Sequence, residues 1–80
     1  MKIGDQVKFD IHSYELTSYW DTPFGVTYLY TFRDFFNHIF IWRSQKFIEE
    51  DVYSIKGRIH NIEKFNGEEE FVLKYCRVNV

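Results

Sequence analysis

The sequence predicts an all-β domain in which five strands close into a small barrel. Three features of its composition favour this fold class. Of the 80 residues, 17 are aromatic, eight are Ile and six are Val, and all of these residue types favour strands. Ala is absent and Leu occurs three times, so the best helix formers are almost missing. A chain of this length has room for one domain, residues 1–80, and its composition excludes a helical bundle.

The first two strands are predicted from alternation of apolar and polar residues. Residues 7–11 alternate in the first strand, which we expect to continue, with a bend, as far as Tyr19. Residues 28–32 alternate in the second. Residues 20–25 hold the only proline and a glycine, which are typical of a connection between strands.

A third strand and a short connection follow. Residues 34–37 are expected to turn the chain into a strand over residues 38–43, whose apolar run is typical of a mostly buried strand. Residues 44–51 leave space for no more than a turn or two of helix, which residues 46–50 would form.

The last two strands are joined by the strongest local signal in the chain. Residues 52–65 are predicted to form a long strand, in which Gly57 permits a bend or a close approach of the backbone. Asn66 and Gly67 then specify a two-residue type I′ hairpin, because both central residues of that turn need a positive φ. The final strand is expected from residue 69 to about residue 80.

The Asn-Gly turn sets a pairing register, which separates the two faces of the hairpin. Counting back from it, Lys56 lies opposite Arg77 and Arg58 opposite Tyr75 on a face that points outward. Lys74 falls on the core face, so a bulge or the end of the barrel must release it. The outward face also holds the pairs Ile62–Phe71 and His60–Leu73, and the core face holds Ile55–Val78, Gly57–Cys76, Ile59–Lys74 and Asn61–Val72.

Five strands, a long first strand and a short connection between the third and fourth strands are the plan of the oligonucleotide/oligosaccharide-binding (OB) barrel. We therefore expect a five-stranded OB-type Greek-key barrel. An SH3-like barrel is the alternative fold.

The charges of the chain are unevenly distributed. Ten basic and twelve acidic residues give a formal charge of −2, but six acids lie in the clusters 49–51 and 68–70, where turns or strand ends are predicted. The middle of the chain is richer in cations, so a basic stripe on an acidic molecule is compatible with the sequence. These cations are Arg33, Arg43, Lys46, Lys56 and Arg58.

The sequence also bears on location and cofactors. No apolar run approaches the roughly 20 residues of a membrane span, and no signal-peptide stretch follows Met1, so a cytoplasmic protein with no membrane partner is expected. Cys76 is the single cysteine and is expected to be an unreactive core residue. Folding without a cofactor is the expectation.

Catalytic and metal-binding patterns are weak. His12, His38 and His60 are assigned to three different strands without the spacing of metal ligands, so no metal site is predicted. The sequence has no Ser-His-Asp arrangement and no glycine-rich phosphate loop, and its acids are assigned to turns rather than to a catalytic pair. We therefore do not expect an enzyme.

About two-thirds of the chain, from Phe24 to Val78, resembles a small OB-type domain family of phage and mobile-element proteins, of a single-stranded-DNA-binding type. Two departures from that family are the absence of a glycine at residues 34–37 and the residues Glu68-Glu69-Glu70-Phe71 and Tyr75, at positions where relatives tend to be basic or polar. The segments that carry the resemblance are Trp20…Phe24-Gly25, Thr31-Phe32-Arg33-Asp34, Ile39-Phe40-Ile41-Trp42, Ile55-Lys56-Gly57-Arg58-Ile59 and Phe65-Asn66-Gly67…Val72-Leu73…Cys76-Arg77-Val78.

The resemblance implies a module that binds single-stranded DNA or RNA. In such a barrel, bases stack on outward aromatics of the second and third strands while Lys and Arg contact phosphates. The platform candidates are Tyr28, Tyr30, Phe40 and Trp42, although core packing is favoured for Phe40 and for Phe32. The candidate nucleic-acid contacts are Tyr28, Tyr30, Arg33, Trp42, Arg43, Lys56, Arg58 and Tyr75.

A protein-interaction domain is the alternative function, with a replication or host protein as partner. The acidic pI of about 5.9 and the run at residues 68–70 favour it. A homodimer through an uncovered edge strand is a further expectation that the sequence leaves open. The orientation of Tyr28, Tyr30 and Trp42 discriminates between the two functions, because outward rings favour base binding and inward rings disfavour it.

Overall fold

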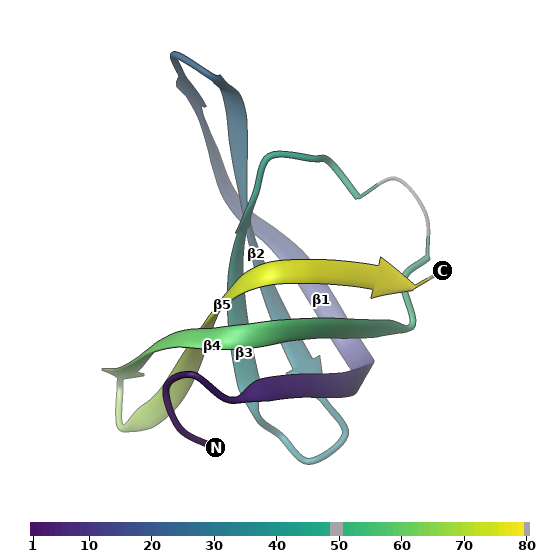
Figure 1. Cartoon of the computed structure of the whole chain (residues 1–80), viewed down its shortest axis with the longest axis vertical. Coiled ribbons are helices and arrows are strands. Elements are labelled where there is room, and N and C mark those ends of the chain that lie inside the picture. Colours follow the sequence, from purple (N-terminus) through teal and green to yellow (C-terminus); the bar gives the residue numbers. More distant parts are fainter. Residues whose placement is uncertain (49–50, 80) are drawn as a thin grey trace.

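The computed structural model describes residues 1–48 and 51–79, and within these ranges it contains five strands (Figure 1). No helix within the described ranges has the length and hydropathy needed to cross a membrane. The strands are β1 (Gln6–Thr22), β2 (Gly25–Asp34), β3 (Ile39–Ser44), β4 (Ser54–Phe65) and β5 (Glu68–Asn79).

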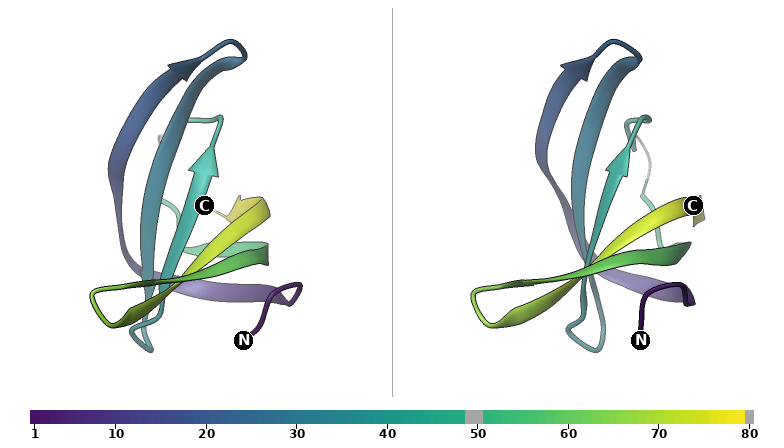
Figure 2. Two further views of the ribbon diagram at one scale, coloured as in Figure 1. Left: turned by 90° about the vertical axis from the view of Figure 1, so that its left-hand side faces the viewer. Right: turned by 60° about the vertical axis from the view of Figure 1, so that its left-hand side comes forward.

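The five strands form one sheet that closes into a ring in the order β1-β2-β3-β5-β4 and back to β1 (Figure 2). β1 closes the ring because it is long enough to pair with two strands. Residues 6–10 pair with β4, and residues 11–22 pair with β2. β3 and β5 are parallel, and the other neighbours are antiparallel. The prediction of an all-β chain with five strands is confirmed.

Residues in the left-handed region form the tight turns. Asn66 and Gly67 have φ values of 51° and 81°, which confirms the predicted type I′ hairpin between β4 and β5. Asn37, with a φ of 69°, adopts a left-handed conformation in the β2–β3 turn without a glycine. The predicted connection over residues 20–25 is wrong in extent, because pairing of Thr22 with Gly25 reduces it to two residues.

The connection between β3 and β4 also differs from the prediction. Residues 46–48 of the expected helical turn are not helical, while residues 49 and 50 lie outside the described residues. Val52 was expected to begin the fourth strand. It is buried in the connection instead, and β4 begins at Ser54.

The register of the β4–β5 hairpin is interrupted by two bulges. Counting from the turn is correct from Phe65 back to Asn61 and again at Lys56, but Arg58 pairs with Lys74 and Ile59 pairs with Leu73. The predicted pairs Arg58–Tyr75, His60–Leu73 and Ile59–Lys74 are therefore wrong.

One extra residue on each strand explains the error, since a bulge exchanges the two faces of the strand beyond it. Lys74 is released from the core, as its charge requires, and Leu73 enters the core. Phe71, which had been assigned to the outward face, is also buried. Asn61, which had been assigned to the core face, is exposed.

The core is built mainly from aromatic rings inside the closed sheet. The rings of Phe9 and Phe40 are stacked with centroids 3.9 Å apart, and Phe71 packs on Phe40 at 5.6 Å. Large rings supply the buried volume that a chain without Ala and with little Leu needs. The buried core residues are Phe9, Tyr30, Phe32, Phe40, Val52, Ile55, Ile59, Phe71 and Leu73.

Gly57 allows β5 to approach β4 closely. A Cβ added to Gly57 would lie 2.8 Å from the Sγ atom of Cys76 and 3.4 Å from the backbone oxygen of Lys74. Gly57→Ala is therefore expected to lower the free energy of unfolding by about 1–3 kcal/mol, measured by urea denaturation.

The double variant Gly57→Ala, Cys76→Ala tests this cause. It removes the Sγ atom from the clash, so it should be more stable than Gly57→Ala alone. A single variant as stable as the wild type, or a double variant with no recovery, would contradict the close approach.

Candidate functional site

Cations on three neighbouring strands lie in register on the outer surface. β4 is paired with β1 on one side and with β5 on the other, so each outward residue of β4 has a partner on both neighbours. Neighbouring strands are about 4.8 Å apart, and alternate residues along one strand are about 6.7 Å apart. Two rows of three residues therefore cover about 10 Å across the strands and about 7 Å along them. The first row is Lys8–Lys56–Arg77 and the second is Gln6–Arg58–Lys74.

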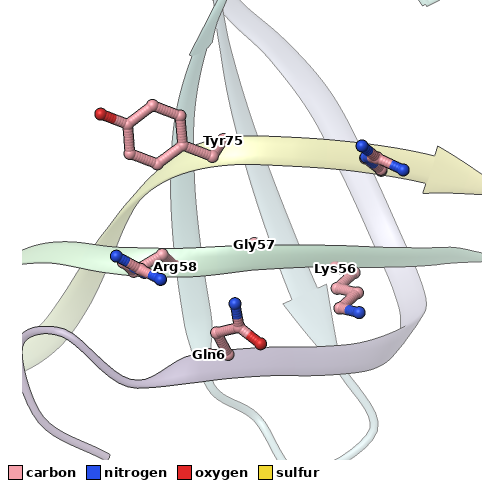
Figure 3. A pocket seen from close by; sticks show the side chains of 6 residues that line it. Gln6, Lys56, Gly57, Arg58 and Tyr75 are labelled. Atoms are coloured by element: carbon pink, nitrogen blue, oxygen red, sulfur yellow. The ribbon is translucent and has the colours of Figure 1, made fainter.

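These six residues and Tyr75 are referred to below as the basic face. All seven side chains are exposed. Gln6, Lys56, Arg58, Tyr75 and Arg77 surround an open hollow of about 420 Å³, and Figure 3 shows the labelled ones extending from β1, β4 and β5 around it. The backbone of Gly57 also lines the hollow.

The basic face concentrates positive charge on an acidic protein. It holds five of the ten Lys and Arg residues, although the whole chain has a formal charge of −2. Among the described residues, a salt bridge joins His38 and Asp34, but no salt bridge involves any of these five cations. None of the five cations is therefore held in an ion pair with a carboxylate in the described part of the chain, which leaves them available to an anion.

Tyr75 is placed on this face by unusual backbone geometry. Its φ is 56°, in the left-handed region that a bulky residue rarely adopts, and it lies in the interval where the β4–β5 register shifts. The side chain is 80% exposed. Bulges often redirect a side chain next to a functional site, and residues in sparsely populated conformations cluster at such sites. The side chain is therefore held in solvent at the hollow that Arg58 and Arg77 also line.

The structure separates the predicted contact residues into three groups. Lys56, Arg58 and Tyr75 lie together on the basic face, as their predicted outward orientation implied. Arg33 and Arg43 are exposed on β2 and β3, on strands that do not contribute to the basic face.

The predicted aromatic platforms form the third group, and here the expectation is wrong for Tyr30. Its side chain is 2% exposed, and its hydroxyl accepts a hydrogen bond of 2.9 Å from the Ile48 N–H. Phe40 is buried, in agreement with the core alternative given for it. Tyr28 and Trp42 are half-buried and pack against the core. The inner face of β2 and β3 therefore does not offer these rings to a base, and by the criterion of ring orientation given above this outcome disfavours base binding on these two strands.

Sequence reasoning missed Gln6, Lys8 and Lys74 and did not include Arg77 among the contacts. Alternation placed residues 6 and 8 on the polar face of the first strand, but it does not reveal which strand lies beside them. The non-local pairing of β1 with β4 brings these residues next to Lys56 and Arg58.

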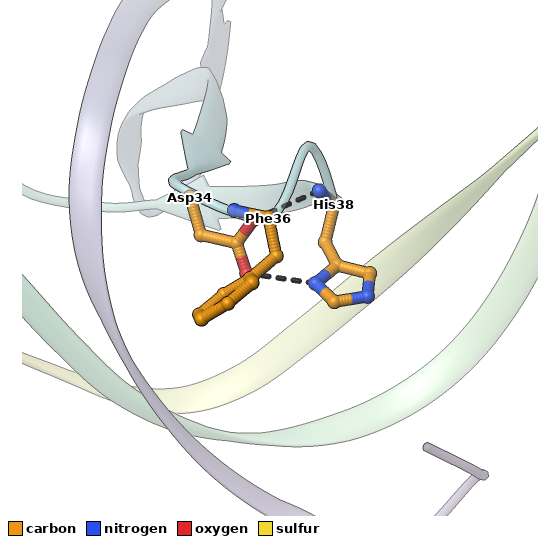
Figure 4. Close-up of polar contacts among 3 residues, drawn as sticks. All are labelled: Asp34, Phe36 and His38. Carbon is orange, nitrogen blue, oxygen red and sulfur yellow. Dashed lines mark hydrogen bonds and ion pairs between the residues drawn. The ribbon is translucent and has the colours of Figure 1, made fainter.

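A second polar cluster lies in the β2–β3 turn (Figure 4). Oδ1 of Asp34 accepts hydrogen bonds from the N–H groups of Phe36 and His38 at 3.0 and 2.8 Å, and Oδ2 lies 2.8 Å from Nδ1 of His38. Burial by itself raises the pKa of Asp34, but the hydrogen bonds from His38 and Phe36 outweigh it and hold the pKa below the usual value. Because these bonds are used to close the turn, the cluster is structural.

Cys76 and the metal-ligand residues complete the survey of reactive groups. Burial raises the pKa of the Cys76 thiol to about 12, so the sulfur is protonated at neutral pH and is a poor nucleophile. This agrees with the predicted unreactive role. No group of three or more His, Cys, Asp or Glu side chains within residues 1–48 and 51–79 has the arrangement of a metal site.

Comparison of the chain with protein-family models, with curated proteins and with solved structures finds no match. The functional argument therefore rests on the geometry and charge of the basic face.

Proposed function

We propose that this protein is an OB-type module that binds single-stranded nucleic acid on the basic face. The observation that carries the proposal is the exposed side chain of Tyr75, which lines one hollow with Lys56, Arg58 and Arg77, three cations that have no acidic partner among the described residues. The chemistry of the face is that of single-strand binders, which combine a positively charged groove with aromatic stacking platforms.

The strand order supports an OB-type barrel over an SH3-like one. In the closed ring, β1 pairs with both β2 and β4, and β5 is inserted between β3 and β4. This strand order is that of a five-stranded Greek key, which is the plan of the OB barrel. The resemblance of residues 24–78 to OB-type domains of phage and mobile elements points the same way.

Each side chain of the basic face has a proposed role that follows from its chemistry. The five cations neutralise phosphates, and Arg58 and Arg77 present the planar guanidinium that also pairs in a fork or stacks on a base. Tyr75 stacks on one base, which contributes about 1–3 kcal/mol. Gln6 both donates and accepts hydrogen bonds, so it suits a base edge or a sugar hydroxyl.

The face favours a single strand over a duplex. A ring that stands in solvent stacks on a base that is unpaired and unstacked, and a duplex does not present such a base without being opened. The proposal assigns binding without catalysis, and it includes no cofactor or metal.

Fluorescence anisotropy of a labelled single strand of about 20 nucleotides, titrated over a range of salt concentrations, tests the proposal. For four to five phosphate contacts, log K is expected to fall with log salt concentration with a slope of about −3, because each contact adds about 0.7 on a single strand. A slope near zero, or equal affinity for a duplex of the same sequence, would count against it.

The variant Tyr75→Gly separates the contribution of ring stacking to strand affinity from the contribution of charge. Glycine tolerates a φ of 56°, so the fold should keep its stability within about 1 kcal/mol, while affinity falls about 5- to 100-fold at an unchanged salt slope. Tyr53→Gly is the matched control, because Tyr53 is 60% exposed but lies in the connection before β4. Equal losses in the two variants would show that Tyr75 is not the stacking residue.

A protein-interaction function is the second candidate. One observation favours it: the β1–β2 hairpin projects beyond the ring with an uncovered apolar surface (Figure 2). That surface lies on different elements from the basic face.

A further inference from the structure

The outer half of the β1–β2 hairpin forms an arm, defined here as Leu16–Thr22 of β1, the turn residues Pro23 and Phe24, and Gly25–Tyr28 of β2. In Figures 1 and 2 it extends past the closed part of the sheet. β3 pairs with β2 only from Tyr28 onward, and β4 pairs with β1 only up to Asp10. The arm is therefore a two-stranded ribbon among the described residues.

One face of the arm continues the apolar side of the core. Leu16 pairs with the core residue Tyr30, and Tyr19 pairs with Tyr28, so Leu16 and Tyr19 share the face of those rings. With Trp20, Val26 and Phe47 they line an open hollow of about 440 Å³. The ring of Phe47 covers part of this face, with its centroid 5.5 Å from that of Tyr28.

This surface is unusual for a molecule that remains alone in water. A two-stranded hairpin is at best marginally stable without something packed on its apolar face. Contiguous exposed apolar patches of this kind mark interaction sites. Tyr19 is 68% exposed and Phe47 is 52% exposed, so most of the face lacks a cover within the described chain.

We propose that a second copy of this chain covers the arm, in a two-fold symmetric dimer in which Phe24 of each copy enters the hollow of the other. Phe24 is 88% exposed at the tip of the same arm that carries the hollow. Phe24 lies two residues before Val26, which lines the hollow, so one arm carries both the ring and the hollow, and a two-fold contact requires such self-complementarity.

The available area suits a weak dimer. Aromatic side chains bury about 150–250 Å² each, so the exposed fractions of Tyr19, Phe24 and Phe47 amount to about 400 Å² per copy. The total of about 800 Å² is below that of stable specific interfaces, so the dimer is expected to be transient, with a dissociation constant weaker than micromolar.

Charge gives this contact a salt dependence opposite to that of nucleic-acid binding. Residues 9–32 contain no Lys or Arg, whereas Glu15 and Asp21 lie on the arm or beside it, and Asp21 lines the hollow. Two arms in contact therefore repel electrostatically, and salt screens that repulsion. Dimerisation should strengthen as salt increases, whereas binding of a strand to the basic face should weaken.

Sedimentation equilibrium of the whole chain at low and high salt tests the dimer. A reversible monomer–dimer equilibrium that tightens with salt is expected, and Asp21→Asn should tighten it further. Phe24→Ser should weaken it at least about 100-fold, because the ring enters the interface twice. Phe36→Ser is the matched control, since Phe36 is 83% exposed but lies in the β2–β3 turn.

Three results would overturn the proposal. They are a chain that stays monomeric at all concentrations, a Phe36→Ser variant that loses association as strongly as Phe24→Ser, and growth beyond the dimer. A monomer whose Trp20 fluorescence is quenched by an added oligonucleotide would assign the arm to nucleic acid instead. Loss of strand binding in basic-face variants that still dimerise would leave this proposal intact, so the two functions fail separately.

Discussion

Exchanging Lys56 and Arg58 for glutamate together is expected to weaken binding of a single strand more than about 100-fold at 0.1 M salt. Two phosphate contacts are lost, which should reduce the magnitude of the salt slope by about 1.4. In addition, two negative charges are placed in the centre of the basic face, where they repel the remaining phosphates and pair with the cations of β1 and β5. Anisotropy titration of the labelled strand measures both quantities.

Arg33→Glu together with Arg43→Glu is the matched control. It changes the net charge of the protein by the same amount, but on β2 and β3 rather than on the basic face. A loss below about tenfold is expected, because charges more than a Debye length of about 10 Å from the strand are largely screened at 0.1 M salt. Equal losses in the two double variants would mean that net charge, not the basic face, governs binding.

Phe40→Ala is expected to remove a large part of the protein's stability at room temperature. The ring is 1% exposed, is stacked on Phe9 and contacts Phe71, so its removal leaves a cavity at the centre of the core. Such a deletion costs about 3–5 kcal/mol. An 80-residue domain has a total free energy of unfolding of about 4–12 kcal/mol, so the loss is at least about a quarter of the total.

Thermal denaturation followed by circular dichroism measures the effect of Phe40→Ala. Phe36→Ala removes the same atoms from an exposed position, and its free energy of unfolding should stay within about 0.5 kcal/mol of the wild type. If Phe40→Ala also stays within about 1 kcal/mol, the aromatic core described here is wrong.

Local sequence signals were most reliable where neighbouring residues alone decide the geometry. The five strands and the type I′ turn at Asn66 and Gly67 follow from period-two alternation and from the preference of Asn-Gly for positive φ. The outward orientation of Lys56 and Arg58 also followed from counting along the strand. In contrast, the turn after β1 was placed too early, because the pairing of Trp20 and Asp21 with β2 is not apparent from their residue types.

The bulges show where counting fails. A single extra residue reverses the faces of a strand, and nothing in the alternation around His60 indicates it beforehand. The awkward position of Lys74 on the core face was the one available signal, since burying an unpaired ammonium is costly. The tertiary structure resolves that conflict with two bulges, and it places Tyr75 on the surface in the same step.

The all-β class, the number of strands and the need for an aromatic core follow from composition and local periodicity. The position of Tyr30 inside the sheet, and that of Lys8 of β1 in one row with Lys56 and Arg77, depend on how the strands assemble. Closure of the ring joins strands that are distant in the chain. Which strands become neighbours depends on the packing of the whole core rather than on any local run of residues.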